Sequence, residues 1–147
     1  MRLFGSYAVE SMRLEKGYRH WKADLVTEFT PFESGLARFV DLGKPAFVGK
    51  AALQAAESRR AFVSVEVHCT HAPAQGGDSI VSGGRIVGTV TSAGWGHRVG
   101  KNIAMGFVEP SCADVGTPLQ VEIIGEAADA TVVPPCLYDP TGSRVRA

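Results

Sequence analysis

The pattern of apolar and polar positions changes near Arg60, and the residues after it carry the clearest signal. Between Ala61 and Cys69, Val63, Val65 and Val67 alternate with polar residues. A period of two places these valines on one face of an extended segment, and this arrangement is typical of a half-buried β-strand. We therefore predict a strand over residues 61–69.

Further short apolar segments follow at close spacing. They are Ser79–Val81, Arg85–Ser92, Ile103–Val108, Pro118–Ile124 and Ala128–Val133. The Ser-Gly-Gly sequence between the first two predicts a β-hairpin, and Pro134-Pro135 ends the last one. The chain's 17 glycines and 8 prolines supply many turns. Five or six such strands predict a small antiparallel, Greek-key-like β-barrel.

The first 60 residues have a mixed pattern. A helix is predicted over residues 7–17, with Ser6 as its N-cap and Gly17 as its C-cap. Irregular chain is predicted over 18–34, a strand over Gly35–Leu42 and a second helix over Gly49–Arg59. The predicted fold class is therefore α+β, mostly β: a short helix and strand segment followed by the barrel. The break near Arg60 divides the chain into residues 1–60 and 61–147.

Composition limits the kinds of partner. In 147 residues, 15 Lys and Arg balance 15 Asp and Glu, so the formal net charge is zero. We therefore expect no nucleic-acid partner and no membrane partner. The three cysteines, Cys69, Cys112 and Cys136, are odd in number and widely spaced. They are typical of reduced thiols in a cytosol-like compartment, and their spacing predicts no metal site.

Two segments contain candidate chemistry. Gly94–Gly100 resembles a dinucleotide fingerprint but has Val99 where the last glycine is required, so it is interpreted as a loop between two strands. Arg13–Trp21, followed by Asp24, Glu28 and Glu33, gathers acids, bases and aromatic residues in irregular chain. An aromatic ring and a carboxylate together can hold a heterocycle, but the same residues also suit a solvated surface segment.

Five motifs, in this order, resemble the glycine-cleavage T-protein (aminomethyltransferase) family. They are Ser11–Trp21, Thr30–Leu36, Phe47–Leu53, Gly88–Ser92 and Asn102–Val108. The sequence of Lys16–Trp21, together with Gly96-His97 and Leu137–Pro140, is similar to one branch of that family. This branch is the folate-binding portion of dimethylglycine and sarcosine dehydrogenases and their oxidase relatives.

The resemblance implies that tetrahydrofolate is bound and receives a one-carbon unit from a methylamine donor such as glycine, sarcosine or dimethylglycine. It implies that Glu28 clamps the pterin edge, with Trp21 beside the folate and Glu15 supporting the pocket. Arg60 is implied to meet the acidic folate tail, and Arg144 is a weaker candidate for the same role.

Full members of the family carry an essential Asp upstream of these motifs, and the dehydrogenase branch carries a flavin region there. Neither has a counterpart in this chain. The resemblance therefore implies a C-terminal fragment with half a folate site: residues 1–60 as a remnant of the folate-binding domain, residues 61–147 as the barrel domain, and no catalytic residue. We expect this chain alone to be inactive, and FAD only if a flavin domain precedes it.

Two alternatives stay open. In the first, the chain is a non-catalytic structural or assembly module that packs against missing folate or flavin domains. In the second, it is one half of an enzyme that a partner subunit completes. In both cases the N-terminal remainder of the parent protein, or a separate subunit, is an expected partner. Exposed apolar surface would allow a homo-oligomer. The expected location is the cytoplasm, or the mitochondrial matrix in a eukaryote.

Overall fold

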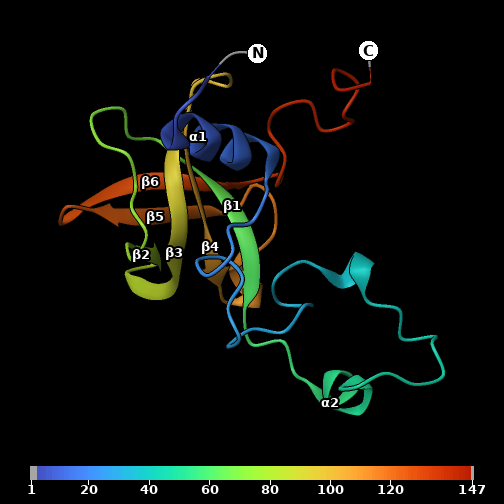
Figure 1. Cartoon of the computed structure of the whole chain (residues 1–147). Helices are drawn as coiled ribbons and strands as arrows, with labels where there is room; N and C mark the ends of the chain where they lie inside the picture. The colour runs from blue at the N-terminus through green and yellow to red at the C-terminus, as the bar shows by residue number, and fades with distance from the viewer. Residues whose placement is uncertain (1–2, 147) are drawn as a thin grey trace.

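The computed structural model describes residues 3–146 and contains a closed antiparallel barrel of six strands (Figure 1). The strands are β1 (Ala61–Val67), β2 (Ser79–Ser82), β3 (Arg85–Gly96), β4 (Lys101–Val108), β5 (Pro118–Ile123) and β6 (Glu126–Val133). Their order around the barrel is β1-β4-β3-β2-β5-β6, with β1 and β6 closing the ring. The predicted fold class and the antiparallel barrel are thus confirmed.

Closure depends on pairs of strands that are not neighbours in the sequence. Val65 of β1 lies opposite Ala104 of β4 on one side and Val132 of β6 on the other. Ile80 of β2 lies opposite Val121 of β5. With both edges of these strands paired, the barrel leaves no long open edge on which another chain could add a strand.

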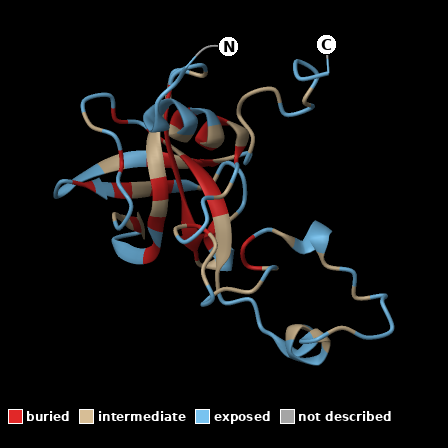
Figure 2. Ribbon diagram, viewed as in Figure 1, coloured by how far each residue is buried: buried red, intermediate tan, exposed pale blue. Residues whose placement is uncertain are grey.

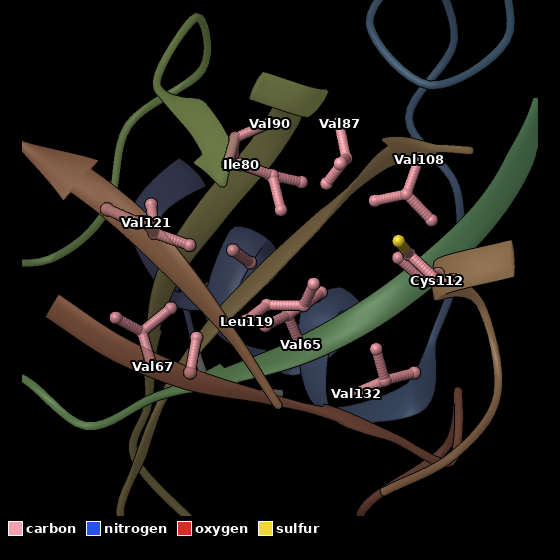
Figure 3. Packing of buried hydrophobic residues seen from close by; sticks show 14 of the residues in the cluster. Val65, Val67, Ile80, Val87, Val90, Val108, Cys112, Leu119, Val121 and Val132 are labelled. Atoms are coloured by element: carbon pink, nitrogen blue, oxygen red, sulfur yellow. The ribbon is translucent and has the colours of Figure 1, made fainter. Parts of the chain in front are cut away.

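The inner face of the barrel is the main hydrophobic core (Figures 2 and 3). Val63, Val65 and Val67 all point into it, as their alternation predicted, and Ile80 and Val121 are completely buried beside them. Burying one such side chain contributes about 1.5–3 kcal/mol relative to leaving it exposed. The core is therefore a main source of the barrel's stability.

Helix α1 (Ser6–Lys16) covers part of the barrel's outer face, across β3 and β4 (Figure 1). Its fully buried Leu14 packs with Ile103 and Met105, which point outward from β4. Ser64, which lies opposite Met105, is buried although its position on the polar side of β1 suggested exposure. The outer face of these strands is therefore a second, smaller core.

The ends of α1 confirm one predicted cap and correct the other. Gly17 is left-handed (φ 70°), its N–H donates to the Leu14 carbonyl, and Tyr18 N–H donates to the Arg13 carbonyl at 2.9 Å. A side chain at Gly17 would collide with the Pro135 backbone. At the start of the helix the N-cap is Gly5, so Ser6 is the first helical residue and not the cap.

Residues 35–58, called the arm below, project from the barrel (Figures 1 and 2). The predicted strand Gly35–Leu42 is wrong: Ala37–Phe39 forms a short 3₁₀ helix instead. Gly35 is left-handed (φ 66°) and none of these residues meets a partner strand, so the extended conformation gains no ladder hydrogen bonds. The second predicted helix is only α2, Lys50–Ala55, because nothing in the described structure buries one of its faces.

The glycine-rich segment Gly94–Gly100 is also not simply a loop. Strand β3 continues to Gly96, and only residues 97–100 form the turn into β4. A second 3₁₀ turn, Pro110–Cys112, joins β4 to β5. All three cysteines are free. Among residues 3–146, no helix has the length and apolar character needed to cross a bilayer.

Candidate ligand-binding groove

Glu28 and Arg60, two of the predicted site residues, line one groove of about 410 Å³. Glu28 comes from the irregular segment after α1, and Arg60 immediately precedes β1. Strand β3 contributes Thr89 and Thr91 to the lining. Folding thus brings a carboxylate and a guanidinium from distant parts of the sequence to the same groove.

A pair of phenylalanines forms the apolar side of this groove. The rings of Phe29 and Phe107 stack with their centroids 3.7 Å apart and an interplanar angle of 20°. Strands β3 and β4 lie close together beside them. Gly88 and Gly106 allow this approach, since a Cβ at either position would collide with the backbone of the opposite strand. The groove therefore combines a flat apolar surface with two opposite charges, as pockets for amphipathic ligands commonly do.

Glu33 holds the base of the arm and positions Arg60. Its buried carboxylate accepts hydrogen bonds from the N–H of Thr30 (2.9 Å), Arg59 (2.8 Å) and Arg60 (3.1 Å), and from the Thr30 hydroxyl. The hydrogen bond from the Thr30 N–H lowers the pKa of Glu33, and burial partly offsets this effect by raising it. The hydrogen bonds from Arg59, the Thr30 hydroxyl and Arg60 lower the pKa further, so it lies below its usual value. The Arg60 side chain donates to the Val87 carbonyl at 2.9 Å, so hydrogen bonds hold both its backbone and its guanidinium in place.

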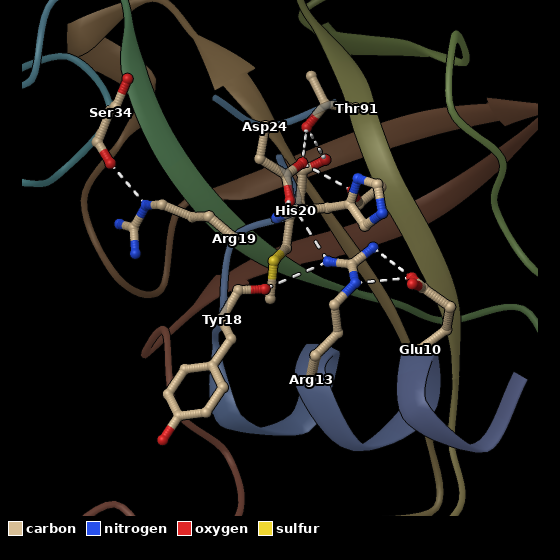
Figure 4. A network of polar contacts seen from close by, with 10 residues as sticks. Glu10, Arg13, Tyr18, Arg19, His20, Asp24, Ser34 and Thr91 are labelled. Carbon is tan, nitrogen blue, oxygen red and sulfur yellow. Dashed lines mark hydrogen bonds and ion pairs between the residues drawn. The ribbon is translucent and has the colours of Figure 1, made fainter. Parts of the chain in front are cut away.

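Asp24 fixes the segment that carries Glu28 onto the barrel (Figure 4). Its carboxylate is completely buried and accepts from the hydroxyls of Thr91 and Ser92 and from His20 N–H at 2.7 Å. Arg13 of α1 forms an ion pair with it at 3.3 Å. Four donors from three parts of the chain therefore converge on one carboxylate.

A β-bulge in β3 makes this convergence possible. Val90 lies opposite Gly106 and Ser92 opposite Met105, so Thr91 is an extra residue in the ladder. A bulge changes the direction of neighbouring side chains, and here two successive hydroxyls reach the same Asp24 oxygen. The bulge therefore anchors residues 18–34 beside the groove.

Trp21 lies in a second groove of about 450 Å³, which shares Val26 and Phe29 with the first. Its ring is 71% exposed. Glu28 is also exposed, and within residues 3–146 its carboxylate forms no hydrogen bond or ion pair. Trp21, Glu28 and Arg60 are thus placed on two adjoining grooves, with an aromatic face and a carboxylate available to a ligand.

The structure places the other two predicted residues elsewhere. Glu15 is buried under the β3–β4 turn, where its carboxylate accepts from the N–H groups of Arg98 (2.5 Å) and Val99 (3.1 Å). Arg144 lies in the exposed C-terminal tail and donates to the Tyr138 hydroxyl at 3.1 Å. Neither residue lines the two grooves, and the contacts of Glu15 serve to hold the turn on α1.

Asp24 and Glu33 position the groove, although sequence reasoning named them only as members of a charged cluster. Glu33 had a local signal, because Thr30-x-x-Glu33 is the spacing of a capping box. The two residues bond reciprocally, with Glu33 N–H also donating to the Thr30 hydroxyl at 3.2 Å. Asp24 had no such signal, since its partners in β3 are recruited by the bulge.

The architecture matches that of a solved aminomethyltransferase. The chain superposes on the crystal structure of glycine cleavage system aminomethyltransferase T from Bartonella henselae with a TM-score of 0.80 and 27% sequence identity. The match covers 86% of this chain and 37% of that one.

Family comparison agrees with this architecture. The family model described as the glycine cleavage T-protein C-terminal barrel domain matches residues 60–139, and one described as the GCVT N-terminal domain matches residues 1–44. The chain belongs to the glycine cleavage T-protein family, as its motifs suggested.

Curated relatives include two kinds of protein. Mitochondrial dimethylglycine dehydrogenase of Mus musculus is 34% identical over 97% of this chain, but only 17% of that protein is covered. Aminomethyltransferase of Saccharopolyspora erythraea is 39% identical over 84% of this chain and 35% of its own length. The chain therefore spans between about a sixth and about a third of the length of these relatives.

Proposed function

We propose that the chain is the C-terminal part of a tetrahydrofolate-dependent protein that transfers a one-carbon unit from a methylamine donor to tetrahydrofolate. Donors of this class include glycine, sarcosine and dimethylglycine. Family membership supports the reaction class. The single observation that carries the folate assignment is the meeting of Glu28 and Arg60 in one groove, beside the stacked Phe29 and Phe107.

The groove has the chemistry that a folate requires. A carboxylate without an internal partner can accept two N–H bonds from the aminopyrimidone edge of a pterin. The exposed ring of Trp21 and the apolar Phe29 offer flat surfaces beside it. Arg60 is suited to a carboxylate of the folate tail, because its guanidinium can form two parallel bonds.

In this proposal the residues of the chain act by binding and orienting the folate. A ligand held on both its pterin and its tail presents its reacting nitrogen in one direction, and such positioning lowers the barrier to transfer. A proton-handling group and the donor site belong to polypeptide outside this sequence, as an upstream domain or a separate subunit. FAD is expected only in such an upstream domain. The chain alone is then inactive.

The same proposal assigns the two parts of the chain and their location. Residues 1–60 complete a folate-binding domain, and residues 61–147 are the barrel domain of the larger protein. The setting is the cytoplasm, or the mitochondrial matrix in a eukaryote, as in the mitochondrial relative.

Calorimetric titration of tetrahydrofolate into the 147-residue chain tests this function. We expect binding at millimolar ligand or better, and at least tenfold weaker binding in Glu28→Gln. Glu57→Gln removes an equally exposed carboxylate from the arm and is the matched control. If the chain alone shows no heat, the titration is repeated with the upstream polypeptide of a family member present. Binding that survives Glu28→Gln would refute the assignment of Glu28.

One observation favours a second function, that of a structural or assembly module. The arm carries Phe39, which is 70% exposed, and Val48, which is fully exposed. Such residues are typical of a surface that packs against another domain or a second copy of the chain. Absence of folate binding both alone and with the upstream polypeptide, together with a stable complex of the two, would favour this second function.

A further inference from the structure

A second cavity, of about 560 Å³, lies at the end of α1 between the base of the arm and the C-terminal tail. Four basic residues line it: Lys16, Arg19, Arg38 and Arg146. No carboxylate lines it among the described residues. Its lining shares no residue with the groove of Glu28 and Arg60. It shares Leu25 and Leu36 with the groove of Trp21, so it adjoins that groove but has its own set of basic residues.

Arg19 is built into this cavity. Its Nε donates to the Ser34 carbonyl at 2.6 Å (Figure 4). Its guanidinium lies 4.8 Å from the centre of the Phe62 ring. A Cβ at Gly35 would lie 2.5 Å from its Nη2, and the left-handed conformation of Gly35 (φ 66°) also favours glycine at this position. Burial lowers the pKa of Arg19, the Asp24 charge raises it, and the charge of Arg38 lowers it. Arg19 and Arg38 thus repel one another across a partly dry space.

Asp24 and Asp139 each pair with a basic residue other than Arg19, Arg38 and Arg146, although the Asp24 charge also acts on Arg19. Asp139 pairs with Lys16 at 3.3 Å, and Asp24 pairs with Arg13. Arg38 lies over the Phe39 ring, with its guanidinium 4.7 Å from the ring centre, and Arg146 donates to the Thr141 carbonyl at 3.1 Å. Within residues 3–146, Arg19, Arg38 and Arg146 form no ion pair with a carboxylate.

Asp24 offsets part of the Arg19 charge from outside the cavity, but no carboxylate among the described residues lines it, so the three guanidinium groups repel one another there. An oxyanion placed among them would remove the repulsion and accept charge-assisted hydrogen bonds, for which the forked guanidinium is well suited. We propose that this cavity is an anion site that binds the carboxylate or phosphate group of a small molecule through Arg19, Arg38 and Arg146. The cavity, of about 560 Å³, is wide enough for a molecule larger than a single oxyanion.

Thermal unfolding of the 147-residue chain with inorganic phosphate or succinate, at constant ionic strength set by chloride, tests the site. We expect both anions to raise the melting temperature in a saturable way. Arg38→Ala should weaken the apparent affinity at least tenfold, and Arg38→Lys should weaken it less. Arg98→Ala removes an exposed arginine at the β3–β4 turn and is the matched control, with unchanged affinity.

Two further measurements make the result decisive. In chloride alone, Arg38→Ala should melt no lower than the unmodified chain, because the substitution relieves repulsion; a lower melting temperature would contradict the proposal. Glu28→Gln should leave phosphate and succinate binding unchanged, so failure of the folate assignment does not affect this test. Absence of a saturable response, or an equal response in Arg38→Ala, would overturn the anion site. A response to succinate but not phosphate would restrict the ligand to carboxylates.

Discussion

The barrel and the arm are stabilised in different ways. In residues 61–133 each strand has partners on both sides and buries one face in a continuous apolar core. In the arm, residues 35–58, no residue is buried, and the connection to the barrel depends on Glu33 at its base. The barrel is thus held by a large apolar area, and the arm by a few hydrogen bonds to one carboxylate.

This difference bears on the candidate site. The groove lies where the two regions meet, with Thr89, Thr91 and Phe107 on the barrel and Glu28 on the segment that leads to the arm. One wall is therefore rigid, and the other is held by polar contacts with Asp24 and Glu33. Asp24 and Glu33 are buried and do not line the groove, yet they hold the segment that forms one of its walls.

The largest expected effect comes from the barrel core. Ile80→Ala should lower the free energy of unfolding by about 2–5 kcal/mol, because Ile80 is completely buried and its truncation leaves a cavity. Val48→Ala in the arm should change it by no more than about 0.5 kcal/mol, since Val48 is fully exposed. Urea denaturation followed by circular dichroism measures both. Equal losses would show that the arm is part of the same cooperative core.

A smaller effect is expected at the junction with α1. Asp24→Asn should cost about 2–4 kcal/mol, because an amide supplies one fewer acceptor at a completely buried position and removes one of the two carboxylates that pair with Arg13. Hydrogen exchange should accelerate in α1 and residues 18–34 more than in strands β5 and β6. Asp41→Asn, whose carboxylate accepts only from Gly43 N–H on the exposed arm, is the control and should have almost no effect. Uniform acceleration throughout the barrel would contradict this localisation.

The smallest effect is expected at the base of the arm, and it depends on pH. Glu33→Gln should cost about 1–3 kcal/mol at pH 7, because a buried carboxylate with four donors is replaced by an amide. The pKa of Glu33 is lowered in the folded state from its usual 4.5. Its contribution is therefore complete above pH 4.5 and is lost as the pH falls through the lower folded-state pKa.

Denaturant titrations of Glu33→Gln and the unmodified chain between pH 2 and pH 7 measure this dependence. The two free energies of unfolding should converge at the acid end. A difference that stays constant down to pH 2 would show that the charge of Glu33 does not contribute. Glu57→Gln on the arm is the control and should follow the unmodified chain at every pH.

The parts of the fold that were predictable have local causes. Alternation of Val63, Val65 and Val67 selects a strand with one buried face, and Gly17 ends α1 because it adopts a left-handed conformation at low cost. The strand predicted over Gly35–Leu42 failed for the opposite reason. Apolar residues there suggested a strand, but an isolated extended segment has no ladder partner.

The candidate site was predictable only in part. Family resemblance pointed to Glu28, Trp21 and Arg60, which the fold gathers on adjoining grooves. It also pointed to Glu15 and Arg144, which the fold places against other contacts. Residue type and motif position do not reveal which carboxylate already accepts hydrogen bonds from backbone N–H groups.

By itself the sequence determined the barrel strands, the end of α1 and the family. These properties follow from periodicity, turn residues and ordered motifs, which are local along the chain. Only the tertiary structure decided the strand order, the convergence of Thr91 and Ser92 on Asp24, and the gathering of Arg19, Arg38 and Arg146 around one cavity. Those features depend on contacts between distant residues, and such contacts exist only once the core has brought the segments together.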